Sequence, residues 1–313
     1  MKKNLEYFKS LRKANCHLHI TGSLRPRDLR RLAKIAHRDI AQYEPLEEHM
    51  KFYDPVIWSA AKEITSTAEG LSEAIKIILT REAEDNVAYV EFTINPAGMV
   101  RRGMTSQDIV VSIKNGFAHG DTLGITSKVK FGVNRKDGPD SVAIVKDVFN
   151  ATPESWRVCI DLNGDERMFQ TSDFIRPFLQ LASENIPVSI HAGEYMGLCN
   201  SLKDAITMNP RRIAHAIAVN EDESIINSFI ENNIILEASL MSNLKTGAIS
   251  DITKHPIKKF INSNVPIVLG SDNPAFFGTT VSSELVCLAN AGVGIDEIEE
   301  LNQRVFKLVD MTK

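Results

Sequence analysis

Residues 188–194 read Val188-Ser-Ile-His191-Ala-Gly-Glu194, an apolar run that ends in a histidine and, two small residues later, a glutamate. If residues 186–190 form a buried strand, His191 lies at its carboxyl end and Glu194 in the turn that follows. A metal-ligand side chain and an acid–base side chain then lie together at one end of the strand. The stretch therefore predicts both a buried strand and a functional site at its end.

Runs of this kind recur along the chain, and each is followed by a segment with helical features. The eight runs cover residues 14–20, 87–94, 128–133, 157–162, 186–191, 212–217, 234–238 and 265–270. Strands that alternate with helices form parallel βαβ units, and eight units in roughly 300 residues favour a closed barrel. No linker-like segment divides the chain. We therefore expect an α/β fold, a TIM (β/α)8 barrel, formed as a single domain by residues 1–313.

Several local signals mark the ends of the expected helices. Thr105 and Asp108 have the spacing of a capping pair at a helix start. Pro177 suits the first turn of a helix, and Asn185 suits a position just beyond a helix end. These signals place helices between the predicted strands, as the barrel requires.

The longest irregular interval, residues 39–67, follows the first predicted strand and is interpreted as an insertion. Its aromatic residues Phe52, Tyr53 and Trp58 could form a hydrophobic lid over the mouth of the barrel, because long insertions after barrel strands often serve the site. The same aromatic residues could equally pack the insertion onto the barrel. The sequence alone leaves both interpretations open.

The overall composition is that of an ordinary globular protein. Hydrophobic residues make up 43% and charged residues 24% of the chain, and the formal net charge is -4. This charge gives no electrostatic reason to expect nucleic acid or an anionic membrane as a partner, and no stretch is long and apolar enough to span a membrane. No Gly-x-Gly-x-x-Gly follows a predicted strand, so a dinucleotide site has no support.

Cysteine usage bears on the cellular compartment. Four scattered residues carry thiols: Cys16, Cys159, Cys199 and Cys287. They form neither a Cys-x-x-Cys motif nor a dense disulfide framework. Together with an amino terminus that lacks a signal-peptide pattern, this favours a cytoplasmic protein with reduced thiols.

Four histidines and an aspartate fall at one end of the predicted strands. His17 and His19 alternate along the first strand and so point to the same face, which in a barrel is the lumen. His191 ends the fifth run, His215 lies near the end of the sixth, and Asp272 follows the eighth. Because catalytic residues of such barrels collect at the carboxyl ends of the strands, this convergence predicts a metal site.

The other four histidines show no comparable pattern. They are His37, His49, His119 and His255, and they fall on predicted helices or loops. We interpret them as surface or capping residues.

Three imidazoles and one carboxylate suit one divalent metal, for which zinc(II) fits best. A second metal would require a bridging group, commonly a modified lysine on the fourth strand, and residues 157–162 contain no lysine. Zinc brings the pKa of a bound water from about 15.7 toward about 7. With Glu194 nearby to transfer a proton, the predicted chemistry is hydrolysis at an electrophilic carbon.

Six segments, in order along nearly the whole chain, resemble the motifs of the adenosine deaminase family of metal-dependent TIM-barrel hydrolases. They are His17-Leu-His-Ile-Thr-Gly-Ser-Leu24, Asp161-Leu-Asn-Gly-Asp-Glu166, His191-Ala-Gly-Glu194, Arg212-Ile-Ala-His215, Ser242-Asn-Leu-Lys-Thr-Gly-Ala248 and Ser271-Asp-Asn-Pro274. Each segment alone is weakly specific, whereas the ordered set is highly specific. The resemblance implies hydrolytic deamination of an aminopurine with release of ammonia.

The resemblance also implies roles for individual residues. The metal ligands would be His17, His19, His191 and Asp272. Glu194 would protonate the ring nitrogen beside the carbon under attack, and His215 would orient the metal-activated water and help to deprotonate it. The main chain of Gly164 would face the purine. These roles agree with the chemistry expected from the residue types alone.

Two departures from the family pattern bear on the substrate. The family usually has aspartate at the position of Thr21, where the carboxylate approaches the ribose 5′-hydroxyl. A second aspartate, which pairs with the N7 side of the purine, is replaced by Asn273, whose amide can donate to an unprotonated N7. Losing both carboxylates should shift specificity, so adenine, a 5′-modified adenosine or another aminopurine is as open as adenosine.

Two alternative functions remain open from sequence. A barrel hydrolase could cleave another C–N bond or an ester bond with the same metal, although Glu194 and Gly164 disfavour it. The second alternative is an inactive purine-binding homologue. The complete set of candidate residues argues against it, because a protein that had lost catalysis would tolerate the loss of some of them. The oligomeric state is not encoded in any recognisable pattern.

Overall fold

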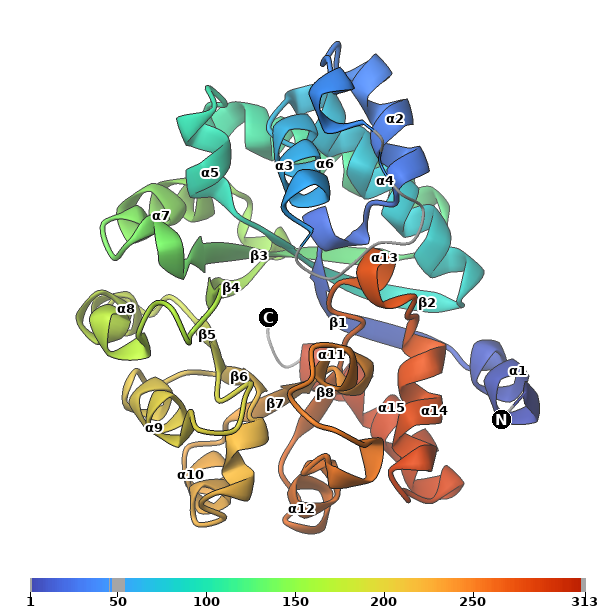
Figure 1. Cartoon of the computed structure of the whole chain (residues 1–313), viewed down its shortest axis with the longest axis vertical. Helices are drawn as coiled ribbons and strands as arrows, with labels where there is room; N and C mark the ends of the chain where they lie inside the picture. The colour runs from blue at the N-terminus through green and yellow to red at the C-terminus, as the bar shows by residue number, and fades with distance from the viewer. Residues whose placement is uncertain (1, 45, 47–53, 311–313) are drawn as a thin grey trace.

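The computed structural model describes residues 2–44, 46 and 54–310, and eight parallel strands in this part of the chain form one sheet in sequence order. The strands are β1 (Lys13–His19), β2 (Val87–Ile94), β3 (Thr126–Asn134), β4 (Arg157–Asn163), β5 (Val188–Ala192), β6 (Arg212–His215), β7 (Ile235–Ala238) and β8 (Ile267–Leu269). Each overlaps one of the eight runs that the sequence predicts as strands. Figure 1 shows the helices arranged around them.

Contacts between β8 and β1 bring the two ends of the sheet together. Leu18 and Asp272 form a parallel bridge, in which the Asp272 N–H donates to the His17 carbonyl at 2.8 Å and the His19 N–H donates to the Asp272 carbonyl at 2.9 Å. Gly270 permits this approach, because a Cβ there would lie 2.2 Å from the Cβ of His17. The fold is a TIM barrel, as the sequence predicts.

Helices and short 3-10 turns fill the connections between strands. From the amino terminus to β2 these are α1 (Lys2–Ser10), η1 (Thr21–Ser23), α2 (Pro26–Ile35), η2 (Ala41–Tyr43), α3 (Pro55–Ile64) and α4 (Ala68–Glu84). Between β2 and β5 they are α5 (Pro96–Arg101), α6 (Ser106–Thr122), η3 (Arg135–Asp137), α7 (Ser141–Ala151), η4 (Glu154–Trp156), η5 (Thr171–Phe174) and α8 (Ile175–Ser183). Beyond β5 they are α9 (Cys199–Thr207), η6 (Ile217–Asn220), α10 (Ile225–Glu231), α11 (Leu240–Lys245), η7 (Ile252–Lys254), α12 (Ile257–Asn262), α13 (Pro274–Phe277), α14 (Val281–Asn290) and α15 (Ile295–Asp310).

The predicted helix signals correspond to helix ends. The Thr105 hydroxyl accepts from the Asp108 N–H at 3.1 Å, and the Asp108 carboxylate accepts from the Thr105 N–H at 2.9 Å, which completes a capping box for α6. Pro177 lies in the first turn of α8. Asn185 follows that helix with a φ of 59°, a left-handed conformation that asparagine tolerates well.

The insertion after β1 is more helical than the sequence indicates. Helix α2 begins directly after η1, and α3 lies within the interval 39–67. Trp58 of α3 stacks on Phe276 of α13, with ring centroids 4.9 Å apart, so this aromatic side chain packs the insertion onto the barrel. Phe52 and Tyr53, the other two aromatic residues of the expected lid, lie outside the described residues.

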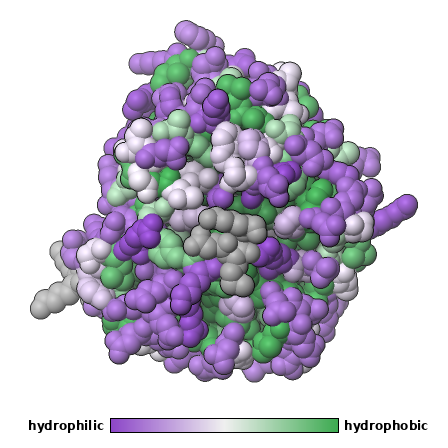
Figure 2. Space-filling model, turned by 180° about the vertical axis from the view of Figure 1, so that it is seen from behind, coloured by the Kyte–Doolittle hydropathy of each residue, from purple (hydrophilic) through white to green (hydrophobic). Residues whose placement is uncertain are grey.

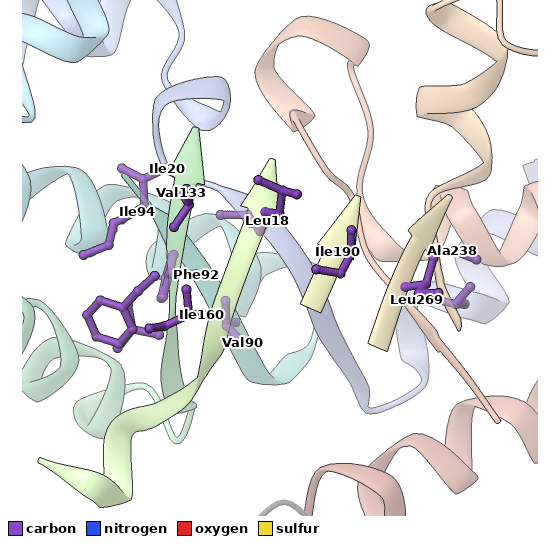
Figure 3. Close-up of a cluster of buried hydrophobic side chains, with 14 of the residues drawn as sticks. Leu18, Ile20, Val90, Phe92, Ile94, Val133, Ile160, Ile190, Ala238 and Leu269 are labelled. Carbon is purple, nitrogen blue, oxygen red and sulfur yellow. The ribbon is translucent and has the colours of Figure 1, made fainter. Parts of the chain in front are cut away.

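Side chains alternate along the strands between a hydrophobic layer and a charged lumen. Val90 and Phe92 on β2 belong to the large hydrophobic cluster that includes residues of the surrounding helices (Figure 3). Between them, Glu91 forms an ion pair with Arg212 of β6, on the other side of the barrel. Only the lumen allows such a contact, so the polar faces of the strands point inward and the apolar faces pack against helices.

The outer surface is mainly hydrophilic on the face shown in Figure 2, where apolar side chains are scattered between polar ones. None of the helices in the described part of the chain combines the length and the apolar character needed to cross a membrane. All four cysteines are unpaired.

Candidate metal centre and active site

Four side chains from β1, β5 and the end of β8 converge at the carboxyl ends of the strands. The Nε2 atom of His191 lies 3.1 Å from that of His17 and 3.3 Å from that of His19. The Asp272 Oδ1 atom lies 3.6 Å from His17 Nε2 and 3.4 Å from His19 Nε2. His17, His19 and Asp272 thus form one group that could hold a metal ion, and His191 approaches both histidines of this group.

These separations fit a tetrahedral zinc ion. Zinc–nitrogen and zinc–oxygen bonds of about 2.0–2.1 Å place neighbouring tetrahedral ligands about 3.3 Å apart. The observed separations of 3.1, 3.3, 3.4 and 3.6 Å lie around this value. The donor set and its spacing therefore fit a divalent cation.

A second layer of carboxylates orients the imidazoles. Glu237 of β7 lies 2.6 Å from His17 Nδ1, and Asp161 of β4 lies 3.2 Å from His191 Nδ1. When these imidazoles are neutral, each Nδ1 donates its proton to a carboxylate, and each Nε2 keeps a lone pair that points to the centre. This is the tautomer that a metal ligand requires.

Asp272 is held from several directions. The Ser242 hydroxyl donates to Asp272 Oδ2 at 2.6 Å, and the Asn273 amide donates to Oδ1 at 2.8 Å. The backbone of Asp272 is left-handed, with a φ of 57°, and its two main-chain hydrogen bonds to β1 hold it in this conformation. Such strain in a non-glycine residue is typical of functional sites.

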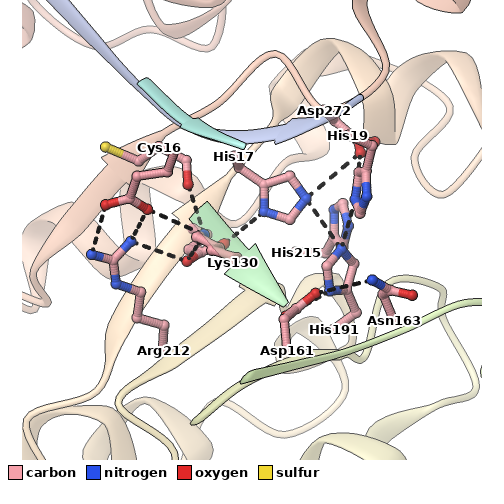
Figure 4. A network of polar contacts seen from close by, with 12 residues as sticks. Cys16, His17, His19, Lys130, Asp161, Asn163, His191, Arg212, His215 and Asp272 are labelled. Carbon is pink, nitrogen blue, oxygen red and sulfur yellow. Dashed lines mark hydrogen bonds and ion pairs between the residues drawn. The ribbon is translucent and has the colours of Figure 1, made fainter. Parts of the chain in front are cut away.

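A fully buried ionic network lies beneath the centre (Figure 4). Glu237 forms ion pairs with Lys130 of β3 and, at 3.3 Å, with Arg212. Arg212 also binds Glu91 through two nitrogens, at 2.6 and 3.1 Å. Burial alone would raise the pKa of Glu237. The contacts of Glu237 with Lys130, His17 and Arg212 instead hold this pKa well below its usual range. Glu237 therefore remains an anion beneath the ligands.

The anionic surroundings favour positive charge at the centre. Burial alone lowers the pKa of His17, yet hydrogen bonds with Asp272 and Glu237 raise it to about 9. The site attracts a proton because carboxylates outnumber cations around this imidazole. A divalent cation bound at the centre would balance the same negative charge.

His215 is connected to a buried chain of hydrogen bonds that determines where its proton lies. The main-chain N–H of Ile257 donates to His255 Nδ1 at 3.0 Å, so neutral His255 carries its proton on Nε2, which lies 3.3 Å from Asn243 Oδ1. The Asn243 amide then donates to His215 Nδ1 at 3.1 Å. Burial lowers the pKa of both histidines to about 3. Neutral His215 therefore carries its proton on Nε2.

Glu194 is placed by the loop after β5 and holds a proton at neutral pH. Burial, with Asp272 and Glu166 nearby, raises its pKa to about 8. The loop is anchored by the buried Glu166 carboxylate, which accepts from the Gly193 N–H at 3.0 Å, from the Glu194 N–H at 2.6 Å and from the Ser201 hydroxyl. A proton donor is thus available beside the centre.

One cavity of about 670 Å³ includes these groups in its wall. His19, His191, His215, Glu194 and Asp272 line it at the strand ends. The volume is in the range of pockets that bind small organic molecules. The cavity therefore joins the candidate metal centre to the proton donor.

Comparison with known proteins decides the family. A family model described as adenosine deaminase matches residues 12–308. The chain belongs to the adenosine deaminase family. The resemblance found in the sequence is thereby confirmed.

Curated relatives and solved structures agree with this assignment. An adenosine deaminase of Enterococcus faecalis is 27% identical, over 95% of this chain and 91% of the relative. An adenine deaminase of Agrobacterium fabrum is 26% identical, over 95% and 93%. The apo structure of the N6-methyl-AMP deaminase of Arabidopsis thaliana has a TM-score of 0.83 at 20% identity, covers 97% of this chain and 93% of that one, and shows the shared fold.

The three residues expected to contact the substrate of this adenosine deaminase family member all line the cavity: Thr21, Gly164 and Asn273. Gly164 has a φ of +98°, and a Cβ there would lie 3.0 Å from Asn134 Oδ1, so the position favours glycine. The Asn273 amide nitrogen binds Asp272, while its Oδ1 is buried without a donor among the described residues. Its polar group thus remains available to a ligand.

Sequence reasoning missed the residues that support the ligands. Glu237, Asn243 and Glu166 were not assigned roles, and the structure buries all three next to site residues. The expectation that His255 is a surface or capping residue is half right: it receives the main-chain N–H at the start of α12, but it is buried and connected to His215. A charged residue inside an apolar strand, such as Glu237, is the sequence signal that could have indicated these supporting residues.

Proposed function

We propose that the chain hydrolyses an aminopurine to the corresponding oxopurine and ammonia, with one zinc ion bound by His17, His19, His191 and Asp272. The observation that carries this proposal is the convergence of four ligand residues, three of which line the cavity, beside a glutamate that is protonated at neutral pH. The membership of the adenosine deaminase family supports it.

The metal and the second layer of carboxylates have separate tasks. A bound zinc ion would activate a water molecule as a nucleophile near neutral pH. Glu237 and Asp161 keep the Nε2 lone pairs of His17 and His191 directed to the ion. Ser242 and Asn273 hold the carboxylate of Asp272 in place.

Glu194 acts as the general acid. Its raised pKa keeps a proton on the carboxyl group, which it gives to the ring nitrogen beside the carbon that bears the amine. The ring then accepts the electron pair as the oxygen of water adds to that carbon. One water proton leaves with the amine as ammonia, and the other restores Glu194.

His215 orients the attacking water. Its Nδ1 accepts from Asn243, so its Nε2–H is a donor toward an oxygen in the cavity. In this tautomer Nε2 has no lone pair, so help with deprotonation of the water, the second role that the family implies, would require the proton to move to Nδ1.

The substrate contacts follow the lining of the cavity. The main chain of Gly164 lies against the purine, the second N–H of the Asn273 amide donates to N7, and Thr21 lies beside the 5′ position of a ribose. Thr21 offers a hydroxyl in place of a carboxylate, which supports a preference for a substrate other than unmodified adenosine.

Cysteine state, sheet topology and net charge bear on the location, domain organisation and partners of the protein. We place the protein in the cytoplasm, since its cysteines are unpaired, and in purine metabolism. We assign residues 1–313 to one domain, because all eight strands belong to one sheet. A small aminopurine is the expected partner, and the net charge of -4 offers no attraction to nucleic acid or to an anionic membrane.

Ammonia release by zinc-loaded protein on adenine, adenosine, 5′-modified adenosines and adenine nucleotides tests the proposal. We expect turnover of at least one of these and a loss of about 10²–10⁴-fold in kcat for Glu194→Gln, which cannot transfer the proton. Glu231→Gln, an exposed change on α10, is the matched control.

Two results would favour the alternatives. Hydrolysis of an ester or amide without any ammonia from aminopurines would indicate a different barrel hydrolase. Tight purine binding with no turnover in either the wild type or Glu194→Gln would indicate an inactive binding protein.

A further inference from the structure

A group of cations lines the same cavity away from the strand ends. Lys62 comes from α3, Arg102 follows α5, and Lys136 lies on η3. These segments belong to the connections after β1, β2 and β3, so the barrel brings together three cations that are far apart in the sequence. We call Lys62, Arg102 and Lys136 the cationic cluster.

The cationic cluster has no matching carboxylates. In the described part of the chain, none of its three residues forms an ion pair. Of the four acidic residues that line the cavity, Glu194 and Asp272 lie at the strand ends, Asp137 pairs with Arg101 at 2.6 Å, and Asp165 pairs with Arg167 at 2.9 Å. No ion pair among the described residues therefore neutralises the cluster, and the charge of Asp137 acts on Lys62 less strongly than the charges of Lys136 and Arg102 do.

The cations are close enough to repel one another. Burial lowers the pKa of Lys62, and the charges of Lys136 and Arg102 lower it further. Lys62 lies over the ring of Trp58, with its nitrogen 5.7 Å from the ring centroid, and Arg102 donates through one nitrogen to the Gly98 carbonyl at 2.8 Å. Both side chains are thus positioned while retaining donors for a ligand.

The position of the cluster relates it to the substrate. Helix α3, which carries Lys62, packs against η1, which carries Thr21. Thr21 brings a hydroxyl and no charge to the cavity wall. An aspartate in its place would repel an anion held by Lys62, whereas threonine does not.

We propose that the cationic cluster binds the 5′-phosphate of a purine nucleoside 5′-monophosphate, so that an aminopurine nucleotide is the preferred substrate. This inference rests on the proposed function, since it assumes that the purine lies at the metal centre. A phosphate dianion presents three oxygens, which can accept from three cations that approach from different segments, and guanidinium groups suit it particularly well. A carboxylate on the 5′ carbon would share the anionic chemistry but offers one charge and two oxygens.

The comparison of AMP with three analogues tests this preference. Adenosine lacks the anion, 5′-methylthioadenosine has a neutral 5′ substituent, and adenosine 5′-carboxylate has a single negative charge. We expect kcat/KM for AMP to exceed that for adenosine by about 100-fold or more, because several charge-assisted hydrogen bonds are lost together. Equal or better turnover of adenosine or 5′-methylthioadenosine would overturn the proposal, as would a preference for the carboxylate.

Variants of the cluster assign the effect to its residues. Lys62→Met and Lys136→Met should each lower kcat/KM for AMP by about 10–100-fold and leave that for adenosine unchanged. Lys114→Met, an exposed change on α6, is the matched control and should alter neither. Lys62→Arg should retain most of the preference for AMP. Parallel losses with AMP and adenosine would show that the lysines only stabilise the fold and would overturn the proposal.

Binding of the product separates this inference from the proposed function. If no aminopurine releases ammonia, the proposed function fails, but calorimetry with IMP and inosine still tests the subsite. The phosphate subsite is supported if the wild type binds IMP more tightly than inosine and if Lys62→Met loses this difference while its melting temperature stays unchanged. Equal affinity for IMP and inosine rejects it.

Discussion

The proton on Glu194 sets a limit on the pH range of activity. Burial, with Asp272 and Glu166, raises its pKa to about 8, so the active acid is present below that pH and lost above it. We expect kcat to fall on the alkaline side with an apparent pKa near 8 and to lose about tenfold per further pH unit. A pH–rate profile checks this, and the alkaline limb should be absent from the residual activity of Glu194→Gln. A wild-type profile that stays level well above pH 8 would contradict the assignment.

The position of the proton on His215 depends on a chain of hydrogen bonds that begins at the main-chain N–H of Ile257. In Asn243→Asp, a carboxylate would accept from both His255 and His215, which moves the proton of His215 to Nδ1 and reverses its tautomer. We expect kcat to fall by about 10–100-fold with little change in KM, as for other residues that orient catalytic histidines.

His255→Gln provides the second arm of this test. A glutamine amide can still donate to Asn243, so kcat should lie between those of the wild type and Asn243→Asp. His119→Gln on α6, outside the cavity, is the control. A change in KM alone, with kcat unaffected in Asn243→Asp, would show that the chain only shapes the cavity.

At the scale of elements, the loop between β5 and α9 is held by one side chain. Glu166 accepts hydrogen bonds from the Gly193 and Glu194 amides and from the Ser201 hydroxyl. Glu166→Gln keeps a single acceptor oxygen and should lower the free energy of unfolding by about 2–3 kcal/mol, as expected for hydrogen bonds to a charged group. Urea unfolding measures this effect.

The same change has a second consequence that a loss of stability alone would not produce. The charge of Glu166 raises the pKa of Glu194, so its removal should shift the alkaline limb of the pH–rate profile to lower pH. An unshifted limb in a folded Glu166→Gln protein would show that the carboxylate does not act on Glu194.

At the scale of the whole molecule, a metal bound by the proposed ligands would join β1, β5 and β8, and its removal should weaken the barrel. Without a cation, the imidazoles of His17, His19 and His191 and the carboxylate of Asp272 lie close together with no charge between them. We expect a chelator to lower the melting temperature and zinc to restore it, with a gain of about 4 kcal/mol at a free concentration 1,000 times the Kd. Calorimetry of the chelated and reloaded protein measures the shift, and identical melting temperatures would argue against a metal at this centre.

Much of the fold was accessible from local pattern. The strand runs and the helix signals at Thr105 and Pro177 depend on neighbours a few residues away, so the sequence contains them directly. Because catalytic residues of TIM barrels collect at the carboxyl ends of the strands, His17, His191 and Asp272 could be assigned to one site from the sequence alone.

The supporting residues could not be located in the same way. Glu237 acts on His17 across 220 positions, and His255 reaches His215 only through Asn243. Such contacts depend on how the closed barrel places strands and loops that are distant in the chain. Alternation along the strand is enough to place a charge such as Glu237 in the lumen, but it does not show which imidazole the charge contacts.

Periodicity, capping signals and residue types at strand ends were enough to predict the strand and helix order, the barrel class and the residues of the candidate metal centre. Tertiary structure alone decided the proton on His215, the raised pKa of Glu194 and the gathering of Lys62, Arg102 and Lys136 in one cavity. The physical reason is that burial and charge act through space. Their effect is defined only when loops from separate βα units share the same cavity.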